Sequence, residues 1–332
     1  MKKVSSLLFS VLFLTTFVKA QDIHLSQFNA APITLNAANT GNFDGQFRVT
    51  TNYRNQWASV SAPYVTGIVS ADFTLLKKKK NFFGLGLTGI DDRSGTGELT
   101  NRKIYCSAAY HIHIGKSDTP KHYIHIGIQG GYINRTININ KLVFANQYDP
   151  TTHTFSNVSD ESFNANSNSN YYDLNVGAVW TSTFSKKFSM QGGVNFMHIN
   201  NPKEMYLVFK SKTVSVVGSI VHALAQVNLN DKVSLSPTVL LMNYPTSSEL
   251  TFGSSLNYSL DNFSIYCGAY YRANDAVIGL LGLQCKKVRL GFSYDINVSP
   301  LHAATNYNGA FELSLAYCPY HSTRKIKFYP KD

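Results

Sequence analysis

The sequence is poor in tryptophan, cysteine and charged residues, and these shortages exclude several classes of protein. Among 332 residues there are 2 Trp and 4 Cys, and 15% of the residues are charged. Cys106, Cys267, Cys285 and Cys318 form neither a disulfide framework nor a Cys-x-x-Cys metal motif. After residue 20 no apolar run reaches about eighteen residues, so the chain is not a helical membrane protein. Hydrolase and nucleotide-binding fingerprints are also missing, so we expect no enzyme activity and no cofactor.

Phenylalanine and tyrosine, in contrast, are abundant. The chain has 21 Phe and 20 Tyr, and 44% of its residues are hydrophobic. This apolar content is sufficient for folding and argues against wholesale disorder. Together with the low charge, it favours a large β structure whose walls are apolar on one side.

Residues 1–20 have the three parts of a secretory signal peptide. Lys2 and Lys3 precede a short apolar core, and a cleavage site ends at Ala20 before Gln21. Removal of this segment takes away three lysines and no acid, which leaves a formal charge of +8 in place of +11. A basic balance is common in proteins that bind nucleic acid, but an exported protein seldom meets any, so we expect no nucleic-acid partner.

Apolar and polar residues alternate with period two from residue 45 to the end of the chain. In the segment 288–298 the apolar side chains point one way, and polar side chains such as Arg289 and Asp295 point the other way. Segments 47–54 and 311–317 repeat this pattern. Alternation of this kind predicts strands with one apolar and one polar face.

We predict a single barrel over 45–318, preceded by a lead-in at 21–44 and followed by a tail at 319–332. About fourteen strands are predicted, at 45–56, 64–76, 81–91, 98–114, 122–135, 171–184, 187–200, 212–229, 232–242, 248–259, 262–272, 275–286, 288–298 and 310–318. Alternation alone fits a soluble barrel and an outer-membrane barrel equally well. The two differ in which face of the wall is apolar.

The lengths of the connections separate these two kinds of barrel. Connections after even-numbered strands are short, as at 185–186, and those after odd-numbered strands are longer, with 136–170 the longest. This alternation is typical of bacterial outer-membrane barrels. We therefore predict an all-β, transmembrane antiparallel barrel in the cell outer membrane, surrounded by outer-membrane lipid, with short periplasmic turns and long extracellular loops. The lead-in either plugs the lumen or lies in the periplasm.

Charged residues divide between the two ends of the predicted barrel. The lysines at the short turns are Lys77, Lys78, Lys79, Lys80, Lys116, Lys121, Lys186, Lys187, Lys232, Lys286 and Lys287. The acidic residues on the long loops are Asp91, Asp92, Glu98, Asp149, Asp160 and Glu161. Two interpretations remain open, namely ordinary solvation of turns and a basic periplasmic rim that faces an acidic partner or headgroups.

Four inward charges on the first strand and the last two strands are the candidate site residues. They are Arg48, Arg54, Asp295 and Glu312. Barrel closure places the first and last strands side by side, so these residues can form an ion network in the lumen. Such a network would fill or narrow the channel, and we hypothesise that its role is structural.

Other polar groups are weaker candidates for binding sites. His111, His113 and His125 share the inner face and can bind zinc or copper, but neutral histidines that line a lumen explain them as well. The acidic pair at 91–92 and the loop 149–161 lack EF-hand spacing, so we predict solvated loops and no metal site.

Two of the cysteines lie on adjacent predicted strands. Hairpin register pairs Cys267 with a position nearer Gly282 than Cys285, so we predict free thiols.

A series of motifs resembles the PorP/SprF family of outer-membrane proteins. The lead-in segment Leu25-Ser-Gln-Phe-Asn-Ala-Ala-Pro-Ile-Thr-Leu-Asn36, closing at Gly41, resembles the start of the family, and the segment 52–57 (Asn-Tyr-Arg-Asn-Gln-Trp) resembles its next motif. Further matching segments follow in family order at 72–73, 142–149, 198–202, 275–278, 293–295 and 311–315. Departures include Ile23, Asn29 and Ala37, where the family usually has Pro, Tyr and Pro.

The resemblance implies a non-enzymatic component of the type IX secretion and gliding machinery of Bacteroidetes. It implies support for the export or surface anchoring of specific cargo such as an adhesin, and contact with periplasmic secretion components linked to peptidoglycan. No small-molecule substrate is implied. The alternative function is a passive outer-membrane channel or hydrophobic-solute transporter, for which a circumference of about fourteen strands is large enough.

Overall fold

The computed structural model describes residues 23–60, 62–76, 80–115, 121–155, 168–205, 212–214, 217–245 and 247–319. The predicted signal peptide at 1–20 and residues 320–332 of the tail lie outside the described residues.

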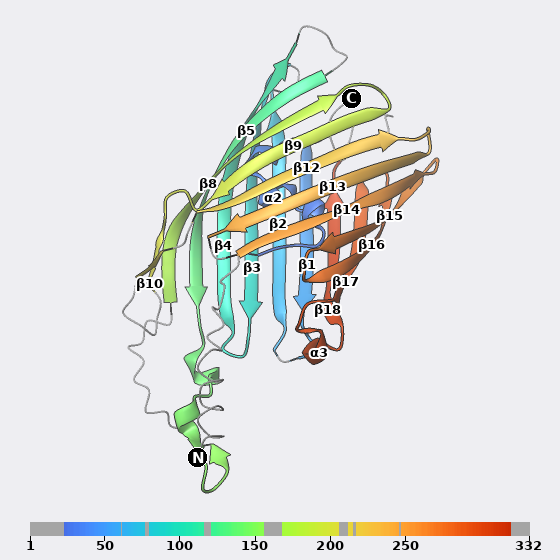
Figure 1. The fold of residues 1–332 in the computed structure, drawn as a ribbon. Coiled ribbons are helices and arrows are strands. Elements are labelled where there is room, and N and C mark those ends of the chain that lie inside the picture. Colours follow the sequence, from blue (N-terminus) through green and yellow to red (C-terminus); the bar gives the residue numbers. More distant parts are fainter. Residues whose placement is uncertain are drawn as a thin grey trace.

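Fourteen antiparallel strands close into one barrel (Figure 1). In chain order they are β1 (Phe47–Gln56), β2 (Tyr64–Leu75), β3 (Phe82–Ser94), β4 (Leu99–Ile114), β5 (Lys121–Thr136), β8 (Asn168–Thr183), β9 (Phe188–Met197), β12 (Gly218–Asn228), β13 (Val233–Tyr244), β14 (Ser247–Ser259), β15 (Phe263–Arg272), β16 (Ala276–Cys285), β17 (Val288–Asn297) and β18 (Asn308–Tyr317). Pairing of β1 with β18 closes the sheet, so the barrel has no free edge. The predicted fourteen-stranded antiparallel barrel is confirmed.

Period-two alternation sets the two faces of the barrel wall. In β17, Leu290 and Phe292 are exposed on the outside, while Asp295 is buried inside. In β1, Phe47 is exposed and Arg54 is buried. Hydrogen bonds between neighbouring strands satisfy the backbone N–H and C=O groups of the barrel. Such a wall is therefore compatible with the hydrocarbon core of a membrane.

Smaller elements lie in the connections. Two hairpins, β6 (Tyr148–Asp149) with β7 (Thr154–Phe155) and β10 (Lys203–Met205) with β11 (Lys212–Val214), stand outside the barrel sheet. The 3₁₀ turns η3 (Ile139–Lys141) and η4 (Ala145–Gln147) precede the first hairpin, and the helix α3 (His302–Thr305) precedes β18. The predicted strand 212–229 is therefore too long. Residues 212–214 satisfy their backbone groups by pairing with β10, and the barrel strand begins at Gly218.

Connection lengths alternate less strictly than the sequence indicates. The longer connections share one end of the barrel, at 57–63, 137–167, 198–217 and 298–307. Three connections at that same end are nevertheless tight, at 95–98, 245–246 and 273–275. A β-hairpin needs only about two to five loop residues, so nothing forces every connection on one side to be long. We call this end the long-loop end and the opposite end, where every connection is short, the short-turn end.

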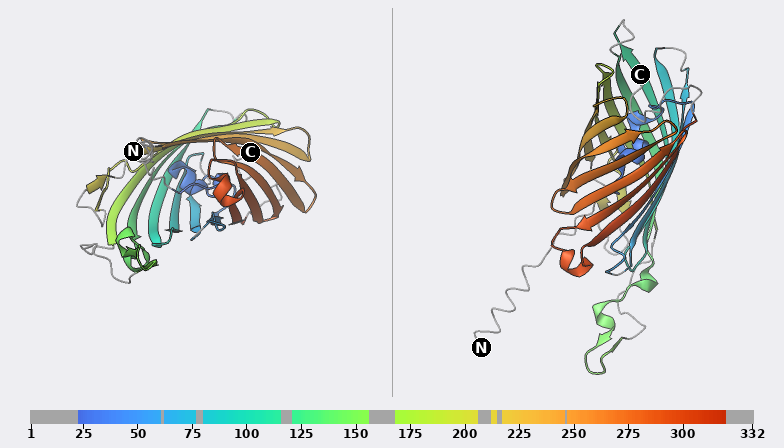
Figure 2. Two further views of the ribbon diagram at one scale, coloured as in Figure 1. Left: turned by 60° about the horizontal axis from the view of Figure 1, so that its bottom comes forward. Right: turned by 90° about the vertical axis from the view of Figure 1, so that its right-hand side faces the viewer.

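The lead-in crosses the interior of the barrel. It contains three one-turn helices, η1 (Phe28–Ala30), α2 (Pro32–Leu35) and η2 (Ala37–Asn39), and both views of Figure 2 show this blue segment within the ring of strands. Pro32 occupies the first turn of α2, where its missing N–H leaves no intrahelical bond unmade. Among the described residues no helix is long and apolar enough to span a membrane. Of the two positions that the sequence left open, the lead-in adopts the internal one.

Candidate functional site

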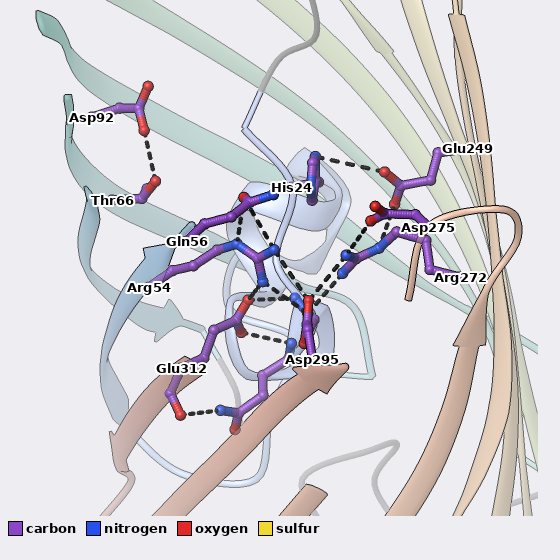
Figure 3. Close-up of polar contacts among 12 residues, drawn as sticks. His24, Arg54, Gln56, Thr66, Asp92, Glu249, Arg272, Asp275, Asp295 and Glu312 are labelled. Carbon is purple, nitrogen blue, oxygen red and sulfur yellow. Dashed lines mark hydrogen bonds and ion pairs between the residues drawn. The ribbon is translucent and has the colours of Figure 1, made fainter. Parts of the chain in front are cut away.

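An ion cluster anchors the start of the lead-in (Figure 3). Glu312 accepts hydrogen bonds from the backbone N–H of Ser26 at 2.6 Å and of Gln27 at 2.8 Å, and Arg54 Nη1 donates to the same carboxylate. Ser26 Oγ donates to Asp295 at 2.7 Å, and Arg54 Nη2 donates to Asp295 at 3.2 Å. All five residues are buried. Because buried carboxylates are costly unless they are paired and hydrogen-bonded, this cluster depends on the lead-in as well as on the wall.

Arg272 extends this cluster, and our sequence reasoning missed it. Its guanidinium donates to Asp275 and Asp295, each at 3.0 Å, and lies 3.3 Å from Glu249. The sequence could have indicated Arg272, because this arginine occupies an inward position of a strand in which apolar and polar residues alternate. His24 Nδ1 lies 3.6 Å from the same Glu249. Burial lowers the pKa of His24, and the charge of Glu249 only partly opposes this shift, so the neutral imidazole is favoured.

Arg48, the fourth predicted residue, belongs to a different cluster. Its Nε and Nη2 donate to Asp72 at 3.0 and 2.7 Å, and Nη2 also donates to Asn39 O at 3.2 Å. Asp72 accepts a further hydrogen bond from the backbone N–H of Gly41 at 2.7 Å. Arg48 and Arg54 lie six positions apart on one strand, a separation of about 20 Å, so they cannot share one network. Each arginine anchors a different part of the lead-in.

Asn36 fixes the middle of the lead-in to the barrel wall. Its Nδ2 donates to Ala178 O at 3.3 Å and to Val194 O at 3.0 Å, while its Oδ1 accepts from Ala38 N at 2.9 Å. A Cβ atom at Gly177 would lie 2.0 Å from Asn36 Oδ1. Glycine at this inward position is therefore what allows Asn36 to reach the wall.

The end of the lead-in approaches the wall as closely as Asn36 does. A Cβ atom at Gly84 would lie 2.0 Å from Thr40 O, and Gly41 itself adopts a left-handed φ of 75°. Inward glycines thus let the backbone of the lead-in lie directly against β3 and the side chain of Asn36 lie directly against β8.

Apolar contacts complete the docking of the lead-in. Leu25 packs in a buried cluster with inward residues of five strands, namely Ile68, Ile90, Tyr105, Ile133 and Tyr171. Phe28 and Leu35 pack in a second cluster with Met197, Ile220, Leu240 and Met242. These inward positions depart from the polar inner face that alternation predicts, because the lead-in rather than water covers them. Each fully buried side chain of this kind stabilises by about 1.5–3 kcal/mol, so apolar burial contributes substantially to docking.

Two of the three candidate histidines form a buried pair. His111 and His125 lie opposite each other in register, and their Nδ1 atoms are hydrogen-bonded. His111 Nε2 donates to Thr40 O, since a carbonyl only accepts, and His125 Nε2 contacts Thr181 Oγ1 at 2.9 Å. Both rings are therefore hydrogen-bonded at both nitrogens, and His111 holds the lead-in at Thr40. His113 packs instead against Tyr123.

Acidic residues at the long-loop end pair with nearby cations. Asp91 lies 3.0 Å from Arg93 and 3.1 Å from Arg102, and Glu98 contacts Lys141 at 2.5 Å. Their side chains are about half exposed. The described residues contain no group of three or more His, Cys, Asp or Glu arranged to hold a metal ion.

The remaining candidates of the sequence analysis are acidic loop residues, lysines of the short turns and the cysteines. Asp149 accepts hydrogen bonds from Thr151 and Thr152 in its own turn, which hold the pKa of its carboxyl below the usual range. Asp160, Glu161, Lys116 and Lys77–Lys79 lie outside the described residues. No disulfide joins any of the four cysteines, and Cys267 lies opposite Leu281.

A cavity of about 1080 Å³ opens at the short-turn end. Gln27, Phe28 and Pro32 of the lead-in form its floor, and inward side chains of β12 to β18 and of β1 form its wall. On the opposite side of the lumen, η2 packs against β4, β5 and β8. We call this cavity the vestibule.

An edgeless antiparallel barrel with an apolar outer wall, whose interior is occupied by its own N-terminal segment, is an outer-membrane barrel with an internal plug. The chain belongs to the family described as type IX secretion system membrane protein PorP/SprF, whose model matches residues 17–317. It is thus an outer-membrane component of the type IX secretion system.

Several solved structures are similar to this chain in fold. The toluene transporter TbuX of Ralstonia pickettii is 11% identical, with a TM-score of 0.49 over 88% of this chain and 94% of that chain. The toluene transporter TodX of Pseudomonas putida is 11% identical, with a TM-score of 0.47 over 89% and 95%. A Pseudomonas aeruginosa FadL homologue is 9% identical, with a TM-score of 0.41 over 85% and 91%. No curated protein sequence matches the chain.

Proposed function

We propose that this protein is a non-enzymatic accessory of type IX secretion that supports the export or surface anchoring of specific cargo, such as an adhesin. Its family membership supports a role in the machinery. The observation that carries the proposal is the lead-in, which lies inside the barrel and is hydrogen-bonded to the wall at Glu312, Asp72 and Val194. A barrel interior that its own lead-in occupies suits a docking scaffold better than a conduit for solutes.

In this proposal the two ends of the barrel have different partners. The long-loop end, with the β6–β7 and β10–β11 hairpins, faces the cell exterior and holds the cargo. The short-turn end faces the periplasm and meets secretion components linked to peptidoglycan. The uneven connection lengths at the two ends support this orientation.

Deletion of the gene tests the proposal in cells. We expect one or a few surface proteins to disappear from the cell exterior while nutrient uptake and outer-membrane permeability stay normal. Crosslinking of the intact complex in cells, read by mass spectrometry, then identifies cargo and periplasmic partners. Intact surface display together with reduced solute permeability would contradict the proposal.

The second candidate function is a passive channel or hydrophobic-solute transporter. The vestibule favours it, since about 1080 Å³ of the lumen is open to one end. Planar-bilayer recordings of the purified full chain separate the two functions. Large, stable conductance steps support the channel, whereas a closed baseline that opens when the lead-in anchors are removed supports the scaffold.

A further inference from the structure

The mouth of the vestibule carries an excess of positive charge. Six of its lining residues besides Arg48 are cations, namely Lys186, Lys187, Lys232, Lys286, Lys287 and Arg289. Two carboxylates, Asp231 and Asp261, line the same cavity. The lysines come from three different connections, 184–187, 229–232 and 286–287, so positive charge surrounds much of the opening. A recess with low-dielectric walls focuses such a field and draws anionic groups inward.

Below its mouth the vestibule has a neutral polar wall. Ser236 of β13, Ser255 and Asn257 of β14 and Gln284 of β16 line it. Hydroxyl and amide side chains both donate and accept hydrogen bonds, so they match the alternating N–H and C=O groups of an extended peptide. Tyr266 lines the same wall, and its ring centroid lies 4.0 Å from the guanidinium carbon of Arg289, a cation–π contact that holds this cation against the wall.

The lead-in, which forms the floor of the vestibule, is hydrogen-bonded to the barrel wall. Gln27 Nε2 donates to Glu312 O at 3.1 Å, and its Oε1 accepts from Ser314 Oγ at 2.8 Å, so this floor residue is tied to β18. The volume of about 1080 Å³ is at the upper limit of small-molecule pockets, which span about 300–1,000 Å³. A ligand therefore enters from the short-turn end and stops at the lead-in, as a loop or chain terminus would.

We propose that the vestibule binds an extended acidic segment of a periplasmic protein, with carboxylates at the lysines of the mouth and peptide groups along the Ser and Asn wall. This inference rests on the proposed function for the orientation of the short-turn end. A polypeptide fits better than lipid headgroups, because these lysines line a cavity inside the barrel while lipid surrounds its outer wall. The closed sheet offers no edge for strand addition, so side chains carry the recognition.

Binding of a defined peptide to the purified full chain in detergent micelles tests the inference. The probe is a short fluorescein-labelled peptide in which Glu alternates with Ser, and its partner probe has Gln in place of Glu. The vestibule variant Lys232→Gln/Lys287→Gln removes two mouth cations. The matched control Lys80→Gln/Lys121→Gln removes the same charge at the same end of the barrel but outside the cavity. A third variant, Ser255→Trp, fills the vestibule without changing its charge.

We expect fluorescence anisotropy to show binding of the Glu peptide that weakens as salt rises from about 50 to 500 mM, and weak binding of the Gln peptide. Lys232→Gln/Lys287→Gln should weaken binding about three- to tenfold, as two partly exposed ion pairs imply, and the control pair should have little effect. Ser255→Trp should abolish binding, with circular dichroism verifying the fold of every variant. Equal losses in both lysine pairs, or full binding by Ser255→Trp, would overturn the inference, as would displacement of the Glu peptide by short-chain phosphatidylglycerol.

The same variants in cells separate failure of this inference from failure of the proposed function. If gene deletion leaves surface display intact, the proposed function is wrong. If deletion abolishes display but Ser255→Trp supports display at the wild-type level, the vestibule inference alone is wrong.

Discussion

Glu312 is the residue whose substitution most directly tests how the lead-in is held. Its buried carboxylate accepts from two backbone N–H groups of the lead-in and from Arg54. Glu312→Gln keeps the shape but removes the charge, and it turns an NH₂ group toward donors that need an acceptor. Removing one partner of a buried ion pair typically costs about 3–5 kcal/mol. Release of the lead-in should therefore become about a hundredfold or more easier.

Native-state proteolysis in detergent, read by mass spectrometry, measures this release. The rate of cleavage within 23–44 reports the open population when opening and closing are fast relative to cleavage. Glu98→Gln is the matched control, because it makes the same substitution in the half-exposed pair with Lys141, where about 0–1 kcal/mol is expected. Cleavage of Glu312→Gln at the rate of Glu98→Gln would refute the argument. A double variant with Arg54→Met should cost less than the sum of its single substitutions, because it leaves no unpaired guanidinium.

Three further predictions concern the same segment. Gly84→Ala places a Cβ atom 2.0 Å from Thr40 O and should cost about 1–3 kcal/mol and speed cleavage of the lead-in, while Gly89→Ala on the same strand, with no atom within 4 Å, should be neutral. Asn36→Ala leaves the lead-in without its hydrogen bonds to β8 and β9 and should destabilise docking by about 1–3 kcal/mol; an unchanged thermal midpoint and cleavage rate would contradict this. Because burial lowers the pKa of His24, which faces Glu249, Arg272 and Arg54, the released chain binds a proton more readily below pH 6.5 than the docked chain. Docking should therefore weaken as pH falls below 6.5, and His24→Asn should reduce this slope in pH-dependent proteolysis.

The sequence predicted most of the barrel. Strand positions follow from alternation, since successive side chains of a strand point to opposite faces, and this local rule holds wherever one face meets lipid. The short connections at one end were also recognisable, because they are the gaps between successive alternating segments. Residues 212–214 were assigned to the wrong strand, because a hairpin beside the barrel has the same local pattern as a strand within it.

The candidate site was accessible only in part. Arg54, Asp295 and Glu312 were singled out because closure brings the first and last strands together, which is a topological argument that needs no coordinates. Arg272 lies on β15, two strands from Asp295 on β17, so its contact with this cluster depended on the order and curvature of the strands in the closed barrel. The partner of Arg48 on β2, Asp72, was in the sequence but depended on the register of that pair.

The amino-acid sequence alone thus determined the kind of wall, its strand number and its outward apolar face, because these depend on local period and on hydrogen bonding between chain neighbours. Only the tertiary structure decided that the lead-in lies inside the barrel. That outcome depends on contacts between residues more than a hundred positions apart, such as Asn36 with Val194 and Ser26 with Glu312, and on glycines whose missing Cβ atoms make room for them. No local sequence pattern encodes such contacts, because a residue of the lead-in and its partner in the wall can be recognised only when both positions in the fold are known.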